Sequence, residues 1–238
     1  MISAIRQFFL IAAILVVTGC AGPVRKIDTS PGALADVKTV AVIRAPEPKT
    51  YTVMNFGHPG IAFGLVGGLV AAADQSSKQE RLTKAIKEKA PAQTADALAE
   101  GIAGQLQRRG FDARVEDGPW EENDGKFKLE FDKITSSADA VLVVTPTMVG
   151  FIATGVTSDY LPTVTAIITL LGKDRKEQLY RGFHAAGWQP KAEGWRYSPP
   201  TETFGNFDAL MADPTKTGLA LAGAAREIAS TVADDLKR

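Results

Sequence analysis

The chain has a single cysteine and two histidines among its 238 residues, and its charges balance. Because Cys20 is the only cysteine, no disulfide can form within the chain. Neither His58 nor His184 is followed by a second ligand at a zinc-binding spacing, so no zinc site is predicted. Lys plus Arg and Asp plus Glu number 27 each, which gives no electrostatic reason to expect a nucleic-acid partner.

Catalytic and cofactor motifs are also missing. The sequence has no Gly-x-Ser-x-Gly elbow, and its glycine-rich stretch at 60–73 lacks the Gly-x-Gly-x-x-Gly spacing of a dinucleotide loop. The acidic turn "EENDG" fails as an EF-hand, because the first and last ligands would be Trp120 and Phe131. We therefore expect no catalytic residues, no metal and no cofactor.

What the sequence does contain is a secretion signal. Arg6 precedes ten apolar residues, "FFLIAAILVV", a run too short for a membrane span of about 20 residues. The tetrapeptide "VTGC" follows and resembles the lipobox of bacterial lipoproteins, in which the cysteine becomes the lipidated first residue. That resemblance implies a signal peptide at 1–19 and palmitate or another acyl chain on Cys20.

The residue after the cysteine predicts the membrane to which the lipoprotein is sorted. Lipoproteins of enteric type that carry Asp there stay in the inner membrane, whereas this chain has Ala21. The resemblance therefore implies a lipid-anchored protein of the outer membrane that faces the periplasm, with lipid as one partner. Acyl chains contribute about 0.8 kcal/mol per buried methylene, which is enough for anchoring without a spanning helix.

The mature chain is predicted to be one domain on a tether. Residues 20–36 lack apolar periodicity and contain turn-forming Pro and Gly residues, so they are assigned to the tether. The remainder, 37–238, is long enough for a single domain, and an apolar content of 45 % is ample for a core.

Within 37–238 the patterns alternate between strand and helix. Short β-branched runs predict strands at 37–45 and 111–115, and a helical pattern between them is interrupted by Pro91. Residues 116–126 read as a polar loop, and 127–131 as a half-exposed strand. Three segments, at 138–155, 162–171 and 176–187, carry the strongest β signal and predict antiparallel strands, with Gly172 available for a positive φ in the second turn.

The last helix carries the clearest signals. Asp213 and Pro214 suit the N-cap and first helical positions, and apolar residues then recur every three or four positions from Leu221 to Leu236. The predicted class is α+β, with a mixed, largely antiparallel sheet covered by two or three helices.

A family resemblance appears at this point. The strand-helix-strand start, the strand "ADAVLVV" and the hairpin "TAIITLLGKDRKEQLYRGF" resemble the periplasmic lipoprotein domains of the CsgG, LpoB and PelC kind, related to the TolB N-terminal fold. The resemblance covers residues 37–238 and implies a protein that binds partners or assembles. The glycine-rich stretch and the tryptophan-rich segment are not features of that family.

The glycine-rich stretch is the first candidate surface. Gly60, Gly64, Gly68 and Ala72 recur every four residues, so on a single helix they would form a smooth ridge for close helix contacts. The ridge could pack in the domain's own core, meet a partner or a second copy, or dip into one membrane leaflet. We take self-association or partner binding as the working hypothesis.

The second candidate surface is the segment "GWQPKAEGWRYSPPTETFG". Its four aromatic residues, Trp188, Trp195, Tyr197 and Phe204, lie among prolines that stiffen the chain. Such rings bury a large area at low entropic cost, as interfaces require. The alternative is a loop held across the sheet by its own rings.

The sequence therefore predicts a non-catalytic, lipid-anchored envelope protein that acts as a partner-binding or self-assembling scaffold. The alternative is an envelope enzyme or small-ligand carrier, in which His184 and Tyr180 would line a pocket with Asp or Glu from the 116–124 loop.

Overall fold

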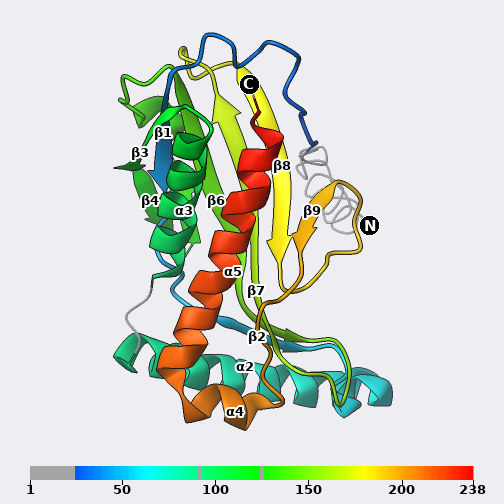
Figure 1. Cartoon of the computed structure of the whole chain (residues 1–238). Helices are drawn as coiled ribbons and strands as arrows, with labels where there is room; N and C mark the ends of the chain where they lie inside the picture. The colour runs from blue at the N-terminus through cyan, green and yellow to red at the C-terminus, as the bar shows by residue number, and fades with distance from the viewer. Residues whose placement is uncertain (1–24, 90–92, 124–125, 238) are drawn as a thin grey trace, which may run out of the picture.

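The computed structural model describes residues 25–89, 93–123 and 126–237. These ranges form an α+β domain around one seven-stranded mixed sheet, with β2 beside β6 and the other strands in the order β3-β1-β6-β7-β8-β9 (Figure 1). The predicted fold class is therefore confirmed. The strands are β1 (Thr39–Arg44), β2 (Thr52–Asn55), β3 (Asp112–Asp117), β6 (Ala140–Ala153), β7 (Leu161–Leu171), β8 (Gln178–Ala186) and β9 (Trp195–Ser198).

Pairing in the sheet follows the order of the chain only from β6 to β9. The long strands β6, β7 and β8 form antiparallel hairpins, as the sequence predicts. Parallel pairs flank them, β3 with β1 and β1 with β6 on one side and β8 with β9 on the other. The prediction misses β9, a four-residue strand inside the aromatic segment.

Two helices cover one face of this sheet. They are α3 (Thr94–Arg108) and α5 (Pro214–Asp235), which lie side by side in front of the strands (Figure 1). Their predicted apolar stripes are buried, for example Leu98 and Ile102 in α3 and Leu221 and Ile228 in α5. The main core therefore lies between these helices and the sheet.

The start of α5 matches its sequence signals. The Asp213 carboxylate accepts a hydrogen bond from the Lys216 backbone N–H at 3.0 Å, and Pro214 occupies the first turn, where its missing N–H costs nothing. A short helix, α4 (Phe207–Ala212), precedes it and is capped in the same way by Asn206.

The other face of the sheet carries a small hairpin instead of a helix. Strands β4 (Trp120–Asn123) and β5 (Lys126–Leu129) pair in antiparallel fashion, and a short 3-10 helix, η2 (Phe131–Lys133), follows. The prediction of a polar loop is thus wrong for Trp120–Asn123. The hairpin stays on the sheet because Trp120 and Leu129 pack on a second core with Ile43 and Val143.

Residues assigned to the tether partly belong to the domain. Ile27 exchanges backbone hydrogen bonds with Arg181 of β8, at 2.9 and 2.8 Å, and Leu34 is buried in the main core. The described part of the tether, 25–36, is therefore packed against the sheet.

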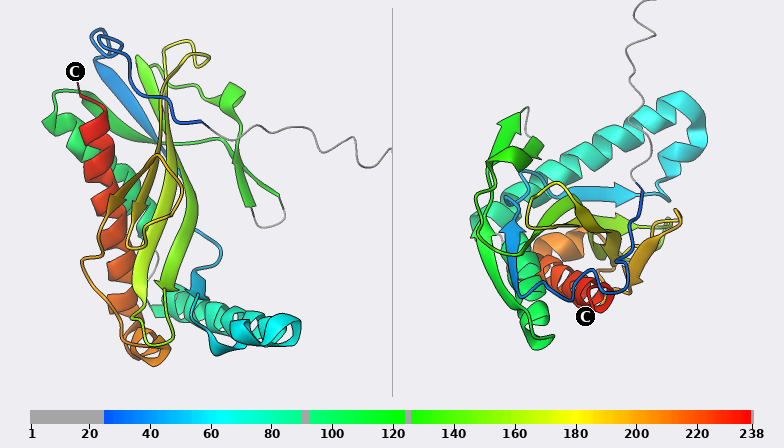
Figure 2. Two further views of the ribbon diagram at one scale, coloured as in Figure 1. Left: turned by 90° about the vertical axis from the view of Figure 1, so that its right-hand side faces the viewer. Right: turned by 90° about the horizontal axis from the view of Figure 1, so that it is seen from above.

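Helix α2 (Gly64–Lys89) is longer than the predicted segment from Ser77. A 3-10 helix, η1 (Pro59–Phe63), precedes it. Helix α2 crosses the lower end of the sheet, and it projects with the β4–β5 hairpin on the side opposite α5 (Figures 1 and 2). No helix in the described ranges combines the length and apolar character that crossing a membrane requires.

The turn between β7 and β8 differs from its prediction in one respect. The positive φ, 62°, falls on Arg175 and not on Gly172. The Arg175 guanidinium donates hydrogen bonds to the carbonyl oxygens of Gly172, Ser136 and Ala138 at 2.7 to 3.0 Å. These bonds offset the strain of a left-handed conformation at a residue with a side chain.

Candidate functional site

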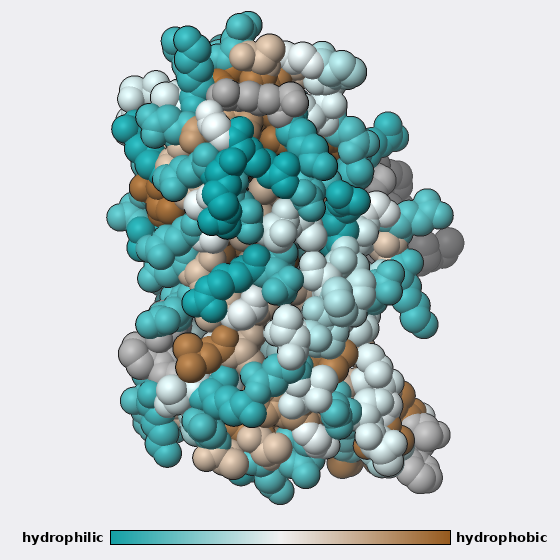
Figure 3. Space-filling view, viewed as in Figure 1, coloured by the Kyte–Doolittle hydropathy of each residue, from teal (hydrophilic) through white to brown (hydrophobic). Residues whose placement is uncertain are grey.

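Large apolar side chains are exposed together at the end of the molecule formed by the N-terminal half of α2. We call this the α2-end surface, and it comprises Phe56, Ile61, Val66, Leu69, Val70 and Val156. Val66 is 74 % exposed and Leu69 64 %. The face over α3 and α5 is mostly hydrophilic, and its brown side chains are scattered, some of them at the lower right, where this half of α2 lies (Figure 3). Large apolar side chains that are exposed in one contiguous patch mark an interaction site on a folded domain.

The arrangement of α2 explains this exposure. Gly67 and Ala71 are buried toward the domain, whereas Val66, Leu69 and Val70 are exposed to solvent. The first charge in the helix is Asp74, which pairs with Lys78 one turn later at 2.6 Å. The first ten residues of α2 therefore present an uncharged surface to solvent.

The predicted glycine ridge is wrong for Gly60. Gly60 lies in η1, and Gly64 joins η1 to α2 with a φ of 67°, which breaks the single helix that the ridge needs. A Cβ on Gly60 would lie 2.5 Å from the Gly67 carbonyl oxygen, so this glycine serves contact between η1 and α2.

The other ridge residues have no such internal role. Gly64 and Ala72 are exposed and Gly68 is half-buried. A Cβ built on Gly64 or Gly68 would meet no atom within 4 Å apart from its own chain neighbours and helix backbone. Glycine inside a helix costs up to about 1 kcal/mol relative to alanine, and packing within the described chain does not require it at Gly68.

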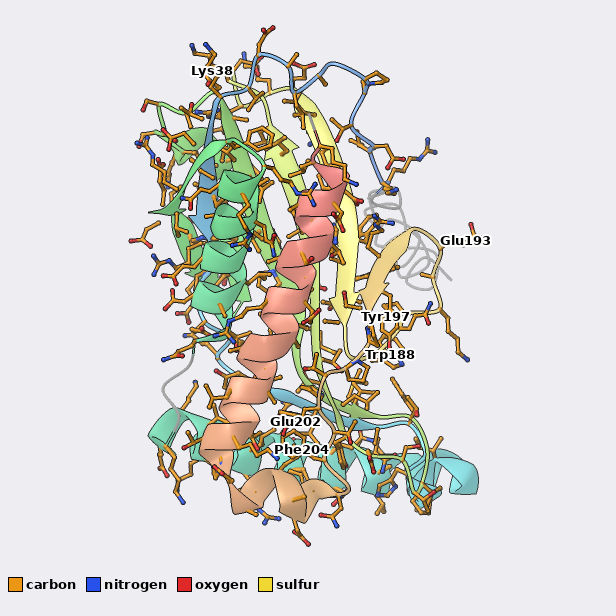
Figure 4. All side chains as sticks on the ribbon, viewed as in Figure 1. Lys38, Trp188, Glu193, Tyr197, Glu202 and Phe204 are labelled. Atoms are coloured by element: carbon orange, nitrogen blue, oxygen red, sulfur yellow. The ribbon has the colours of Figure 1, made fainter. Side chains whose placement is uncertain are left out.

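The aromatic segment is divided between core and surface. Phe204 is buried, with its ring edge-on to Phe151 at 5.5 Å between centroids, and its backbone pairs with Tyr160. Figure 4 shows it near the lower end of the molecule, apart from Trp188 and Tyr197. The prediction of Phe204 as a contact residue for a partner is therefore wrong, because its ring fills the core.

The remaining rings of the segment are half-buried against the sheet. Trp195 packs on Phe183 at 5.6 Å, and the Tyr197 hydroxyl donates to the Gly187 carbonyl at 3.2 Å. Trp188 contacts Phe56 at 5.8 Å, so the segment continues into the α2-end surface. Whether these three rings bind a partner stays a prediction.

His184 belongs to a buried polar network. Its Nε2 shares a hydrogen bond of 2.7 Å with the Tyr180 hydroxyl, and its Nδ1 shares one of 2.8 Å with the Thr231 hydroxyl of α5. Tyr180 donates in turn to Asp235 at 2.9 Å, and Asp235 pairs with Arg196 at 2.8 Å. Burial lowers the pKa of His184 to about 4 and raises the pKa of Tyr180.

The predicted pocket around His184 does not match this arrangement. His184 is fully buried, and its nearest carboxylate comes from α5 and not from the 116–124 loop. That loop continues from β3, which three strands separate from β8. Because both ring nitrogens are bonded within the domain, the geometry supports a structural role for His184.

His58 lies apart from His184, at the start of η1. Its Nδ1 accepts a hydrogen bond from the Gly60 backbone N–H at 3.0 Å, and its Nε2 lies 3.4 Å from Asp74. No group of three or more His, Cys, Asp or Glu side chains that could hold a metal occurs in the described part of the chain.

Sequence reasoning missed one hollow. A cleft of about 390 Å³ lies where Trp120 and Phe127 of the β4–β5 hairpin overhang the 45–50 connection and residues 145–147 of β6. No local signal in the sequence indicated it, because the prolines of "APEPKT" and the two aromatic residues are far apart along the chain and only the fold brings them together. Cys20, the predicted lipidation site, lies outside the described residues.

No family model matches the chain, and no curated protein sequence matches it. Among solved structures it is similar to a PelC dodecamer from Paraburkholderia phytofirmans, with 13 % identity, a TM-score of 0.40, and coverage of 91 % of this chain and 100 % of that chain. A dodecameric variant of that PelC gives 14 % identity at the same coverage, with a TM-score of 0.39. A likeness this distant carries no functional argument.

Proposed function

We propose that this protein is a non-catalytic, lipid-anchored component of the bacterial envelope that assembles with further copies of itself through the α2-end surface. One observation carries the proposal: six large apolar side chains are exposed on α2, on η1 and in the turns that follow β2 and β6. Burying them would remove apolar surface from water, which favours association by about 25 cal/mol per Å² buried.

The open positions on α2 also favour a close contact between copies. Gly68 and Ala72 lie one turn apart, and a side chain at Gly68 would have room in the monomer. A second helix could therefore approach the backbone of α2 at these positions. The predicted lipid anchor would also favour assembly, because attachment at Cys20 would confine the copies to one membrane surface.

The first test is the solution mass of residues 21–238, measured by size exclusion with light scattering over a range of concentrations. We expect a discrete oligomer. The double variant Val66→Ser and Leu69→Ser should be a folded monomer, because both side chains are exposed in the single domain. Leu219→Ser is the matched control, since Leu219 is 56 % exposed on α5, and it should leave the oligomer intact.

A wild-type monomer at every concentration would contradict the assembly proposal. So would an oligomer that persists in the double variant. Anchoring is tested separately by labelling cells with radioactive palmitate. We expect label on the wild-type protein and none on a Cys20→Ser variant, which should also leave the membrane fraction.

A further inference from the structure

The cleft under the β4–β5 hairpin results from a gap in the sheet. Strand β1 pairs with Ala140–Val143 and β2 pairs with Gly150–Ala153, so residues 144–149 of β6 have no strand beside them on this side. The gap coincides with a bulge in β6 between Pro146 and Met148.

Proline explains why the strands separate here. Pro146 in β6, and Pro46 and Pro48 in the connection between β1 and β2, have no backbone N–H to donate. The connection therefore leaves the sheet edge after Arg44 and returns at Thr52. The cleft lies between this connection and β6.

Two aromatic rings form the opposite wall, and the fold holds both in place. The Trp120 indole N–H donates to the Arg44 carbonyl at 2.7 Å, and the ring packs on the second core. Phe127 is half-buried at the position paired with Glu122. The rings are thus ordered before any ligand arrives, which lowers the entropic cost of binding.

The polar groups of the cleft suit a ligand without net charge. Lys49 is the one charged side chain that lines it within the described chain, and it is already ion-paired with Glu122 and lies 5.8 Å over the Phe127 ring. Thr50, Thr145 and Thr147 line the same space, and hydroxyls can both donate and accept hydrogen bonds.

We infer that this cleft binds a short, extended and uncharged peptide segment of a partner protein, with a proline or aromatic side chain held between Trp120 and Phe127. An extended main chain matches the part of β6 that has no neighbouring strand, since peptides bind open sheet edges through backbone hydrogen bonds. Every residue of 144–149 except Pro146 has a backbone N–H. A flat apolar side chain matches the two rings and the three prolines.

The size of the cleft fits this ligand. Its volume of about 390 Å³ is near the lower end of the range for ligand pockets, roughly 300 to 1,000 Å³. A few residues fill such a space, whereas a large cofactor does not. The cleft lies on the hairpin and β6, so this inference is independent of assembly through the α2-end surface.

The test uses residues 21–238, which contain every described element, labelled with ¹⁵N for NMR. The probe is the capped tripeptide acetyl-Pro-Tyr-Pro-amide, and acetyl-Ala-Ser-Ala-amide is its matched control. We expect saturable shifts of the Trp120 indole signal with the first probe, and at least tenfold weaker binding in a Phe127→Ser variant. Phe131→Ser removes an exposed ring outside the cleft and should leave binding unchanged.

Melting curves of both variants show whether the fold is retained. If Phe127→Ser unfolds the hairpin, Thr50→Val provides the second variant, because Thr50 is exposed and lines the cleft, and we expect it to weaken binding of the first probe. The inference is overturned if neither peptide gives saturable shifts, if the alanine peptide binds equally well, or if glucose but not the peptide shifts the Trp120 signal.

Discussion

The Tyr180 hydroxyl lies 2.7 Å from His184 Nε2, on the face of β8 that α5 covers. Gly182 lies between the two residues on the same face of the strand, because side chains alternate along β8. A Cβ at Gly182 would come within 1.8 Å of the Tyr180 oxygen and 2.7 Å of His184 Nε2. The missing side chain therefore makes room for the hydrogen bond.

Gly182→Ala should consequently destabilise the domain. We expect a loss of about 1 to 3 kcal/mol in the free energy of unfolding, because the added methyl group forces the buried pair apart. Urea unfolding followed by circular dichroism measures it. Gly172→Ala is the control, since a Cβ there first meets Glu177 at 3.5 Å, and stability should change little. Equal stability of the two variants would show that the network adapts.

The buried imidazole predicts a loss of stability in acid. The pKa of His184 falls from 6.5 to about 4 on folding, mainly because burial disfavours the charged ring. As the pH falls from 6.5 toward 4, the unfolded chain binds a proton that the folded chain does not. This residue should therefore reduce stability by about 1.4 kcal/mol per pH unit within that window.

Urea unfolding at several pH values between 7.5 and 4 tests this dependence. In His184→Gln the contribution of this site to the slope should disappear, although the variant will be less stable at pH 7.5 because the network is altered. His58→Gln changes the other histidine and should keep the wild-type contribution from His184. A slope that is the same in wild type and His184→Gln would contradict the assignment.

Substitution of Gly68 should instead increase the stability of the domain. Gly68 lies inside α2 and has open space around its Cα, so Gly68→Ala should stabilise the isolated domain by roughly 0.5 to 1 kcal/mol. Thermal melting at a concentration where the protein is monomeric measures the gain. A loss of stability instead would show that Gly68 packs against its own chain.

The elements that the sequence predicted best are those whose signals are local. Asp213 and Pro214 define the start of α5, and the spacing from Leu221 to Leu236 defines its buried face. Strands β6 and β7 follow from long β-branched runs whose side chains are mostly buried, so hydrophobicity identifies them. Strand β8 has no β-branched residue and is identified by the hairpin turn that precedes it.

The elements that were missed depend on contacts between distant parts of the chain. The sequence of β4, "WEEN", is mostly charged or polar, and it forms a strand because β5 pairs with it and Trp120 is held by Arg44. The position of Asp235 beside Tyr180 depends on how α5 packs on β8, which no local pattern encodes. The break at Gly64 could not be predicted either, because glycine fits both a helix and a positive φ.

The two halves of the aromatic segment should respond differently to substitution. Phe204→Ala is expected to cost about 3 kcal/mol, since the ring is buried against Phe151 and leaves a cavity. Tyr197→Ala removes a half-buried ring and one hydrogen bond to Gly187, and should cost about 1 kcal/mol. Urea unfolding of both variants measures the difference.

The double variant of Trp195→Ala and Tyr197→Ala then decides between the two interpretations of the exposed half. If these rings hold the segment on the sheet, the variant melts at a lower temperature because Trp195 loses its contact with Phe183 and β9 loosens from β8. If they form a surface for a partner, melting is unchanged and crosslinking to that partner in cells is lost. The packing of Trp195 on Phe183 favours the first outcome, and unchanged melting with lost crosslinking would reverse that conclusion.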